Sequence, residues 1–355
     1  MNRLFFTKCM PLAVLLAVAL FTVPAVSVAQ AEEEPELNIF TWEGYIDQDT
    51  VLAPFTAETG IRINYSTFGS NEEMLVKLQA TGGADYDLVL ASDYVLDALR
   101  QQELIQALDK GKIPNFANLK DACLNQYFDP DSVFVVPYVI GTPVILYDPA
   151  ATGFAITGFA DLWNPALQDN VVVIDDARVV IAHVLKTMGE SFNTTDQAIL
   201  DQAAEKLAPL RPNIRAFDYD TPHVLMAAGE TAAGFLFTPF AALARMERPD
   251  LEVVYPKEGL GIGIDGLVIP AAAPHPDNAH RFLDFLLRPE IAVEIATVQL
   301  YNNVNEAAEP MLPEIFRTEP ALNAPPEMLP DAEFIRFLGD DEAKFQQIWT
   351  AFKQQ

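Results

Sequence analysis

Short apolar segments alternate with longer amphipathic segments along most of this chain, and this alternation restricts the fold more than any other feature of the sequence. Residues 37–40, 61–65 and 87–91 have the length and apolar character of buried strands, and a helix is predicted over 94–100. Ser70 and Glu73 have the spacing of a capping box at the start of another helix. Further strands are predicted at 144–147, 171–174, 214–217 and 232–237. Strands that alternate with helices indicate an α/β fold.

The first 31 residues have the pattern of an export signal. Arg3 and Lys8 precede an apolar run over 11–23, and Ala29-Gln30-Ala31 fits a small-residue cleavage site. The alternative is a membrane anchor, but the run is shorter than the span of about 20 residues that an anchor needs. Cys9 precedes the run, which is the wrong place for a lipidated cysteine. We therefore expect cleavage and a periplasmic location.

Length, cysteine content and charge limit what the exported chain can be. Removal of 31 of the 355 residues leaves 324, which is enough for about two domains. Cys123 is then the one remaining cysteine, so no intrachain disulfide can form, and we expect a buried thiol. The formal charge of −28 becomes −30 after cleavage and would repel nucleic acid and anionic membranes. The negative charge favours cationic partners, although solubility alone would also explain it.

Several motifs point to no chemistry. The stretch Gly261-Ile-Gly263-Ile-Asp-Gly266 matches a dinucleotide-binding pattern in spacing, but a strand over 267–269 follows it where that motif needs a helix. The four histidines are scattered and show no metal-ligand spacing. No nucleophile elbow or phosphate loop occurs, although a triad could be assembled from distant positions. We expect no metal, no cofactor and no enzymatic activity.

Aromatic and acidic residues follow several predicted strands. Trp42, Glu43 and Tyr45 come after the first strand, and rings combined with a carboxylate suit an organic cation. The pair Asp175-Asp176 and the run Ser92-Asp93-Tyr94 also follow strands, where ligands bind in open α/β sheets, but these acids could equally cap helices. Asp265 lies in an apolar, glycine-rich stretch and therefore needs a partner or a wet cleft. It is the strongest single candidate for a functional residue.

Taken together and in order, these and other segments resemble the periplasmic spermidine/putrescine-binding proteins of ABC importers. The resemblance covers nearly all of the exported chain, and no single segment is diagnostic. Its segments are Trp42-x-x-Tyr45, Phe55-Thr-Ala-Glu-Thr-Gly-Ile61, Ser70-Asn-Glu72, Tyr86-Asp-Leu-Val89, Ser92, Pro137-Tyr138, Asp161-Leu-Trp163, Asp175-Asp-Ala-Arg178, Pro256-Lys-Glu-Gly259, Phe285-Leu-Leu-Arg-Pro289 and Tyr301.

The resemblance implies a type II periplasmic-binding-protein fold, with two α/β lobes, a cleft between them and a hinge of crossing strands. Pro137 and Pro143 bracket one expected crossing, and a second is expected near 259–266. We therefore expect an N-terminal lobe formed by 32–141 plus 264–309 and a C-terminal lobe formed by 142–263 plus 310–355. Each lobe is expected to contain a mixed sheet flanked by helices.

The resemblance also implies which residues hold the ligand. Trp42, Tyr45 and Tyr301 match rings that surround the polyamine chain, while Asp176 and Asp265 match carboxylates that receive amines. Ser92 and Tyr94 match further contacts, and Phe237 stands where a tryptophan is usual.

This chain departs from the family at other positions. The acid usually found directly before the tyrosine is Gly44, the acid expected shortly after Asp176 is Val179, and the large ring expected before Asp265 is Gly263. Glu43 and Asp93 could compensate, but Glu43 can do so only if its segment is a loop, because a one-residue shift on a strand reverses the face.

We accordingly expect a monomeric receptor that binds a polyamine-class cation between its lobes and delivers it to the membrane subunits of an ABC permease. The first alternative is a receptor of the same fold for another amine, an amino-acid derivative or a sugar. The second is a secreted enzyme, which only the acid pairs support.

Overall fold

A computed structural model describes Met1 and residues 33–355 of the chain. Residues 33–355 form one compact unit. The predicted export signal, residues 1–31, lies outside the described residues apart from Met1. No helix in the described part of the chain is long and apolar enough to cross a membrane.

The first sheet has seven strands in the order β11-β4-β10-β3-β1-β2, and β12 pairs with β10 beside this path. Strands β1, β2 and β3 run parallel, whereas β10 is antiparallel to both β3 and β4. The bounds are β1 Glu36–Thr41, β2 Arg62–Thr67, β3 Leu88–Ser92, β4 Val136–Gly141, β10 Gly261–Val268, β11 Asn302–Asn303 and β12 Glu333–Phe334.

The second sheet has five strands in the order β7-β6-β8-β5-β9. Its strands β6, β7 and β8 are parallel, and β5 is antiparallel to β8 and β9. The bounds are β5 Pro143–Tyr147, β6 Val171–Val173, β7 Ile214–Phe217, β8 Ala233–Phe237 and β9 Glu252–Val254. The prediction of two mixed sheets is therefore confirmed.

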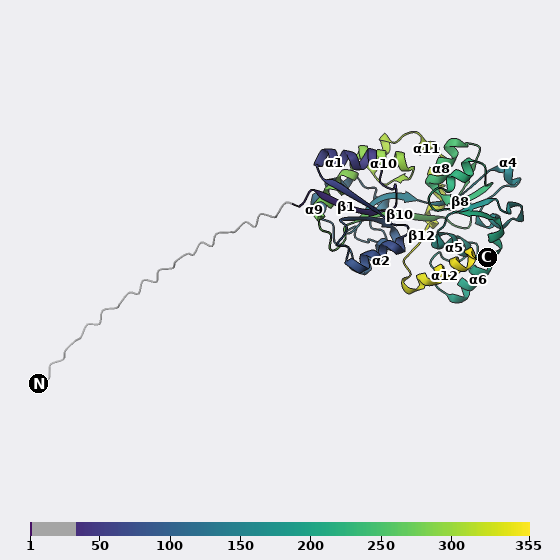
Figure 1. Cartoon of the computed structure of the whole chain (residues 1–355), viewed down its shortest axis with the longest axis horizontal. Helices are drawn as coiled ribbons and strands as arrows, with labels where there is room; N and C mark the ends of the chain where they lie inside the picture. Colours follow the sequence, from purple (N-terminus) through teal and green to yellow (C-terminus); the bar gives the residue numbers. More distant parts are fainter. Residues whose placement is uncertain (2–32) are drawn as a thin grey trace. The chain divides into compact units, whose positions relative to one another are not determined.

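Helices lie on both faces of each sheet, with α1, α2, α9 and α10 around the first and α4, α5, α6, α8 and α12 around the second (Figure 1). Their bounds are α1 Ala53–Thr59, α2 Asn71–Thr81, α3 Asp93–Gln101, α4 Pro149–Thr152, α5 Ala177–Lys186, α6 Gln197–Leu207, α7 Pro222–Ala227, α8 Thr238–Glu247, α9 Pro276–Leu286, α10 Pro289–Gln299, α11 Ile315–Thr318 and α12 Glu342–Lys353. Short 3-10 turns connect many of these elements.

Local sequence signals explain where several helices begin. The Ser70 hydroxyl accepts a hydrogen bond of 3.2 Å from the Glu73 amide, which confirms the predicted N-cap of α2. The Glu73 carboxylate accepts from the Gly69 amide, one position before the one that a capping box would use. Asp176 caps α5 in the same way, because its side chain accepts from the Val179 amide at 3.0 Å.

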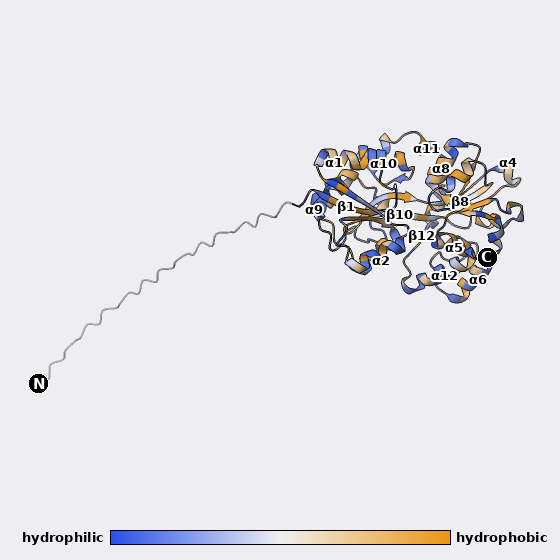
Figure 2. Cartoon of the chain, viewed as in Figure 1, coloured by the Kyte–Doolittle hydropathy of each residue, from blue (hydrophilic) through white to orange (hydrophobic). Residues whose placement is uncertain are grey.

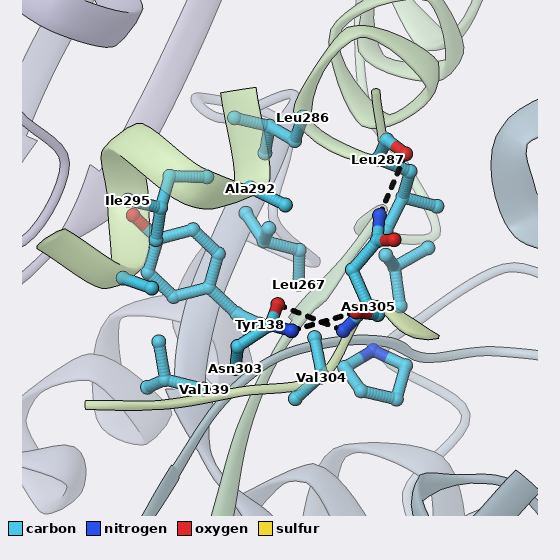
Figure 3. Close-up of a pocket in the computed structure, with 13 residues that line it drawn as sticks. Tyr138, Val139, Leu267, Leu286, Leu287, Ala292, Ile295, Asn303, Val304 and Asn305 are labelled. Carbon is cyan, nitrogen blue, oxygen red and sulfur yellow. Dashed lines mark hydrogen bonds between the residues drawn. The ribbon is translucent and has the colours of Figure 1, made fainter. Parts of the chain in front are cut away.

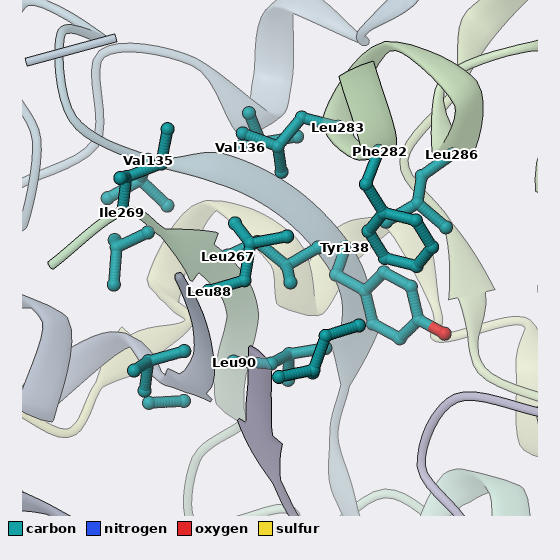
Figure 4. Close-up of a cluster of buried hydrophobic side chains, with 14 of the residues drawn as sticks. Leu88, Leu90, Val135, Val136, Tyr138, Leu267, Ile269, Phe282, Leu283 and Leu286 are labelled. Atoms are coloured by element: carbon teal, nitrogen blue, oxygen red, sulfur yellow. The ribbon is translucent and has the colours of Figure 1, made fainter. Parts of the chain in front are cut away.

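Apolar side chains from both faces of the sheets form the core. In Figure 4, Leu88 and Leu90 of β3 and Leu267 of β10 lie with Phe282 and Leu283 of α9. In Figure 2 the central strands are mostly hydrophobic, and the helices around them carry both hydrophobic and hydrophilic residues. In the second sheet, alternate residues of β6 face opposite layers: Val171 and Val173 join one cluster and Val172 joins the other. Both faces of this sheet are therefore covered.

The two sheets are joined where strands pass from one to the other. Strand β4 belongs to the first sheet and β5 to the second, with Thr142 between them. The pairing of β10 also changes along its length, since Gly261 and Ile262 pair with β12 whereas later residues pair with β3 and β4. We propose that these are the hinge crossings, with lobe boundaries of 32–141 plus 264–309 and 142–263 plus 310–355.

Two motifs weighed in the sequence have structural roles. The glycine-rich stretch lies in β10 and opens no helix, in agreement with the rejection of a dinucleotide site. A Cβ at Gly266 would lie 2.5 Å from Val135 Cγ1, so close packing against β4 requires this glycine. Cys123 is buried with 2% exposure, and burial raises the pKa of its thiol to about 11. The predicted buried thiol is therefore confirmed.

Candidate functional site

A cavity of about 510 Å³ lies between residues of the two sheets. All ten residues selected from the sequence line it, namely Trp42, Glu43, Tyr45, Ser92, Asp93, Tyr94, Asp176, Phe237, Asp265 and Tyr301. A second cavity of about 10 Å³ lies under Tyr138 in the first sheet and has room for about one water molecule (Figure 3). The large cavity is thus the candidate ligand site within the described residues.

Parallel strands of the first sheet deliver one wall of the cavity. Strand β1 ends at Thr41, and Trp42 and Tyr45 lie in the turn that follows. Strand β3 ends at Ser92, and Asp93 starts α3. Because both strands point to the same sheet edge, their following residues meet there. The side-chain amide of Asn71 in α2 donates to the Ser92 hydroxyl at 3.3 Å and to the Tyr94 hydroxyl at 3.1 Å. These two hydrogen bonds hold Ser92 and Tyr94 in position.

Strand β10 brings Asp265 to the same wall by pairing it with Ser92. The Tyr45 hydroxyl donates a short hydrogen bond to Asp265 Oδ2. The amide of Ile264 donates to Asp93 Oδ2 at 3.3 Å, and Tyr94 donates its own amide to Asp93 Oδ1 at 2.7 Å. Two carboxylates from different elements therefore face one side of the cavity.

The second sheet delivers the opposite wall from three neighbouring parallel strands. Asp176 follows β6, Tyr219 follows β7, and Phe237 ends β8. These strands are paired in the order β7-β6-β8, so their carboxyl ends are adjacent. Asp176 and Phe237 were selected from the sequence, whereas Tyr219 was not.

Aromatic rings form a connected group around Asp265. The ring of Tyr45 lies 5.1 Å from that of Trp42 and 5.7 Å from that of Tyr301, measured between centroids. Such distances are typical of packed aromatic pairs. Buried amide contacts hold the segment after Tyr301: Asn305 donates to the Leu287 carbonyl at 2.8 Å, and Asn303 donates to the Asn305 carbonyl at 2.6 Å (Figure 3). The rings are thus held in place from two parts of the chain.

The cavity is negatively charged. Five acids line it, namely Glu43, Asp93, Asp176, Asp220 and Asp265, and no Lys or Arg is among its described lining residues. Desolvation raises the pKa of Asp176 to about 6, against the lowering effect of the hydrogen bond from Val179. Desolvation also raises the pKa of Asp265, and desolvation together with the charge of Asp265 raises that of Asp93 well above its usual value. Desolvated carboxylates of this kind, which accept hydrogen bonds but have no basic partner among the lining residues, are stabilised by a cationic ligand.

The structure accounts for two departures from the family pattern. Gly44 has φ +66°, a conformation that an acidic residue would adopt only with strain, and the surrounding segment is a turn. Because Glu43 lies in a turn, the alternation of side chains along a strand does not place it on the face away from the cavity. Its exposed side chain lines the cavity. Asp93, by contrast, is buried with 3% exposure.

Another departure leaves room for a side chain to start. A Cβ at Gly263 would meet nothing closer than Asp93 Oδ2 at 3.9 Å, which is an ordinary van der Waals contact. Val179 and Ile335 make the part of the lining nearest α5 apolar. The cavity thus has acids on both walls and an apolar patch at Val179 and Ile335.

Sequence reasoning missed Tyr219, His183, Phe192 and Ile335, all of which line the cavity. His183 Nδ1 lies 2.8 Å from the Val179 carbonyl, and burial lowers the pKa of the ring to about 4, so the ring is neutral. Tyr219 could have been found from its position, because it follows the predicted strand 214–217 just as Asp176 follows the predicted strand 171–174. No group of three His, Cys, Asp or Glu side chains that could hold a metal occurs in the described part of the chain.

Comparisons with known proteins agree with this architecture. Residues 50–325 match the family model of the bacterial extracellular solute-binding proteins. The spermidine/putrescine-binding periplasmic protein of Salmonella typhimurium is 36% identical over 328 residues, which cover 92% of this chain and 94% of that protein. The putrescine-binding periplasmic protein PotF of Escherichia coli is 33% identical over 322 residues, with coverage of 85% and 86%.

Solved structures show the same likeness. The spermidine/putrescine ABC transporter substrate-binding protein PotD of Streptococcus pneumoniae has a TM-score of 0.76 and 32% identity, and the match covers 90% of this chain and 98% of that one. A structure from Listeria monocytogenes has a TM-score of 0.85 and 32% identity, with coverage of 90% and 99%.

Proposed function

Because the chain belongs to the bacterial extracellular solute-binding protein family, we propose that it is the receptor of an ABC importer and binds polyamine-class cations in the cavity between its sheets. The observation that carries the ligand class is the composition of the cavity, which has five acids, a connected group of rings and no Lys or Arg among its described lining residues. A cation over a ring contributes about 0.5 to 2 kcal/mol, and a hydrogen bond to a charged group about 1.5 to 3 kcal/mol. The names of the relatives point to the same ligands.

In the proposed mechanism, the ligand bridges the two walls. One ammonium group lies at Asp265, beside Tyr45 and Ser92, and its methylene chain packs on the rings of Trp42 and Tyr301. A second ammonium group pairs with Asp176 on the opposite wall. Contacts to both lobes stabilise the closed form, which the permease then recognises. Export through the signal, a periplasmic location and a monomeric state complete this proposal.

The family has an acid at the position of Val179. In this chain Asp93 supplies a carboxylate instead, from the opposite wall of the cavity. Its burial and the charge of Asp265 raise its pKa well above the usual value, so its ionised form depends on a cation at that end of the cavity. A ligand with more than one N–H group near that end would satisfy both carboxylates. Glu43, which is exposed, would attract the ligand at the rim without a comparable desolvation cost.

The test is a calorimetric titration of the exported chain with putrescine, spermidine, cadaverine and agmatine. We expect binding of at least one of them at one site per chain. The absence of heat and of any thermal shift with all of them would remove the polyamine assignment while leaving the receptor fold intact.

A receptor of the same fold for another amine is the second candidate. The absence of a ring at Gly263 and the apolar lining at Val179 and Ile335 favour it, because they suit a bulkier or less charged amine. Mass spectrometry of ligand released from the natively purified protein would distinguish the two. A secreted enzyme has no comparable support, since Asp176 caps α5 and Asp265 accepts from Tyr45.

A further inference from the structure

Tyr219 connects the two halves of the molecule across the cavity. Among the described residues, it is the one partly buried side chain that packs against both the core cluster of the first sheet and the cluster between the second sheet and α5, α6 and α12. It also lines the cavity. A side chain in this position contacts both lobes, so its packing depends on how closely they approach.

The loop that carries Tyr219 is held in place by its neighbours. The Asp218 carboxylate accepts hydrogen bonds from the amides of Asp220 and Thr221, at 3.0 and 2.9 Å, and from the Thr221 hydroxyl at 3.1 Å. The Asp218 amide donates to the Val173 carbonyl of β6 at 3.1 Å. Helix α7 begins directly afterwards at Pro222. The Tyr219 ring is therefore directed by a preorganised turn beside Asp176.

The Tyr219 hydroxyl has no hydrogen-bond partner among the residues that the structure describes, although acids from both walls are near it. Burial raises the pKa of Tyr219 well above its usual value, and the negative charges of Asp176 and Asp265 raise it further, as does Tyr301. The phenol thus stays protonated and keeps its acceptor lone pairs for a ligand N–H group. Its ring lines the same cavity as the two carboxylates, and an aromatic ring can attract a cation.

We propose that Tyr219 determines the specificity of this site, by closing the space between Asp265 and Asp176 and accepting a hydrogen bond from the ligand. The selected ligand is an elongated cation whose amino groups are spaced to reach both carboxylates at once. This inference rests on the proposed function. It assigns the receptor's preference for cations of one length to the side chain of Tyr219, in the second lobe.

The test compares Tyr219→Phe, Tyr219→Ser and the unaltered chain in calorimetric titrations with linear diamines that differ by one methylene each. Tyr147→Phe is the matched control, because its hydroxyl bonds Glu252 at 2.6 Å and it does not line the cavity. We expect the unaltered chain and the control to prefer the same diamine length. Tyr219→Phe should weaken binding of that diamine about ten- to a hundredfold, the range for a hydrogen bond to a charged group. Tyr219→Ser should also flatten the length preference, which a general loss of stability would not do.

Each outcome separates the inference from the function on which it rests. If the unaltered chain bound no amine, the proposed function would fail and the inference with it. If that chain bound diamines and Tyr219→Phe bound them equally well, the role of the hydroxyl would be overturned. An unchanged length preference in Tyr219→Ser would overturn the role of the ring. Tyr219→Phe retains the ring and its packing, so this variant keeps the test decisive even if the serine variant unfolds.

Discussion

Tyr45 and Asp265 are 220 positions apart in the sequence and are joined by a hydrogen bond from the phenol to the carboxylate. The bond connects the turn after β1 to the middle of β10, where Asp265 lines the cavity. Desolvation raises the pKa of this carboxyl group, so its ionised form lacks a full counter-charge in the protein. A cationic ligand would supply that charge.

Asp265→Asn should therefore weaken polyamine binding without weakening the fold. We expect a loss of about 2 to 5 kcal/mol of binding free energy, as for the removal of one partner of a desolvated charge pair. The free energy of unfolding of the unliganded protein should stay level or rise, because a desolvated carboxylate is removed. Calorimetry and urea unfolding measure the two effects. Asp85→Asn, at an exposed position away from the cavity, is the control, and an unchanged dissociation constant for Asp265→Asn would place the ligand elsewhere.

Two glycines of β10 should respond oppositely to substitution. The Cβ of Gly263→Phe makes only ordinary van der Waals contacts at the cavity wall, so the free energy of unfolding should change by less than about 1 kcal/mol. A new ring beside Asp93 should improve polyamine binding by about 0.5 to 2 kcal/mol. Gly266→Ala forces a methyl group against Val135 and should cost about 1 to 3 kcal/mol of stability. Urea unfolding of both variants checks this pair, and equal destabilisation would show that the wall at Gly263 is filled.

Polyamine affinity should fall on acidification through Asp176. Because its pKa is raised to about 6, the carboxyl group is ionised at pH 7.5 and largely protonated at pH 5 in the unliganded protein. At pH 5 a cation has to displace a proton from Asp176. Protonation of this one group should therefore raise the dissociation constant about tenfold between pH 7.5 and pH 5. Asp176→Asn should bind more weakly at pH 7.5 but lose this part of the pH dependence. Equal pH profiles for the two proteins would contradict the assignment.

His183 should make the stability of the fold fall on acidification. Its pKa is lowered to about 4, so the unfolded chain binds a proton below its ordinary pKa of 6.5 whereas the folded chain does not. Stability from the neutral ring is therefore complete above pH 6.5 and is lost as the pH falls towards 4, by up to about 3 kcal/mol. His183→Leu should remove this slope, because leucine has a similar size and does not titrate. Urea unfolding at intervals from pH 7 to 4.5 measures it, and parallel curves for the two proteins would refute the account.

The sequence predicted the layers of the fold well because its strands are short, apolar and separated by strong helix signals. Strands at 171–174 and 214–217 correspond to β6 and β7, and the N-cap at Ser70 is in place. The ordered resemblance to a family then supplied what local patterns cannot, namely two mixed sheets and the convergence of Trp42, Asp176, Asp265 and Tyr301 on one cavity. Local periodicity alone would not have paired β10 with β3.

The residues that sequence reasoning missed depend on packing between distant segments. Tyr219 follows a predicted strand, but nothing local indicates that it reaches the core of the other sheet. His183 and Phe192 have the sequence character of ordinary core residues, and only the fold brings them to the cavity. The role of Asp93 was ambiguous between a helix cap and a cation partner, and its bond from Ile264 depends on a strand 171 residues away.

The most direct measurement of the central claim is a crystal structure of the exported chain with bound spermidine or putrescine. We predict one ligand in the cavity between the sheets, with an ammonium nitrogen within hydrogen-bonding distance of Asp265 and methylenes against the rings of Trp42 and Tyr301. A ligand bound outside this cavity, or an empty cavity at saturating polyamine, would contradict the account.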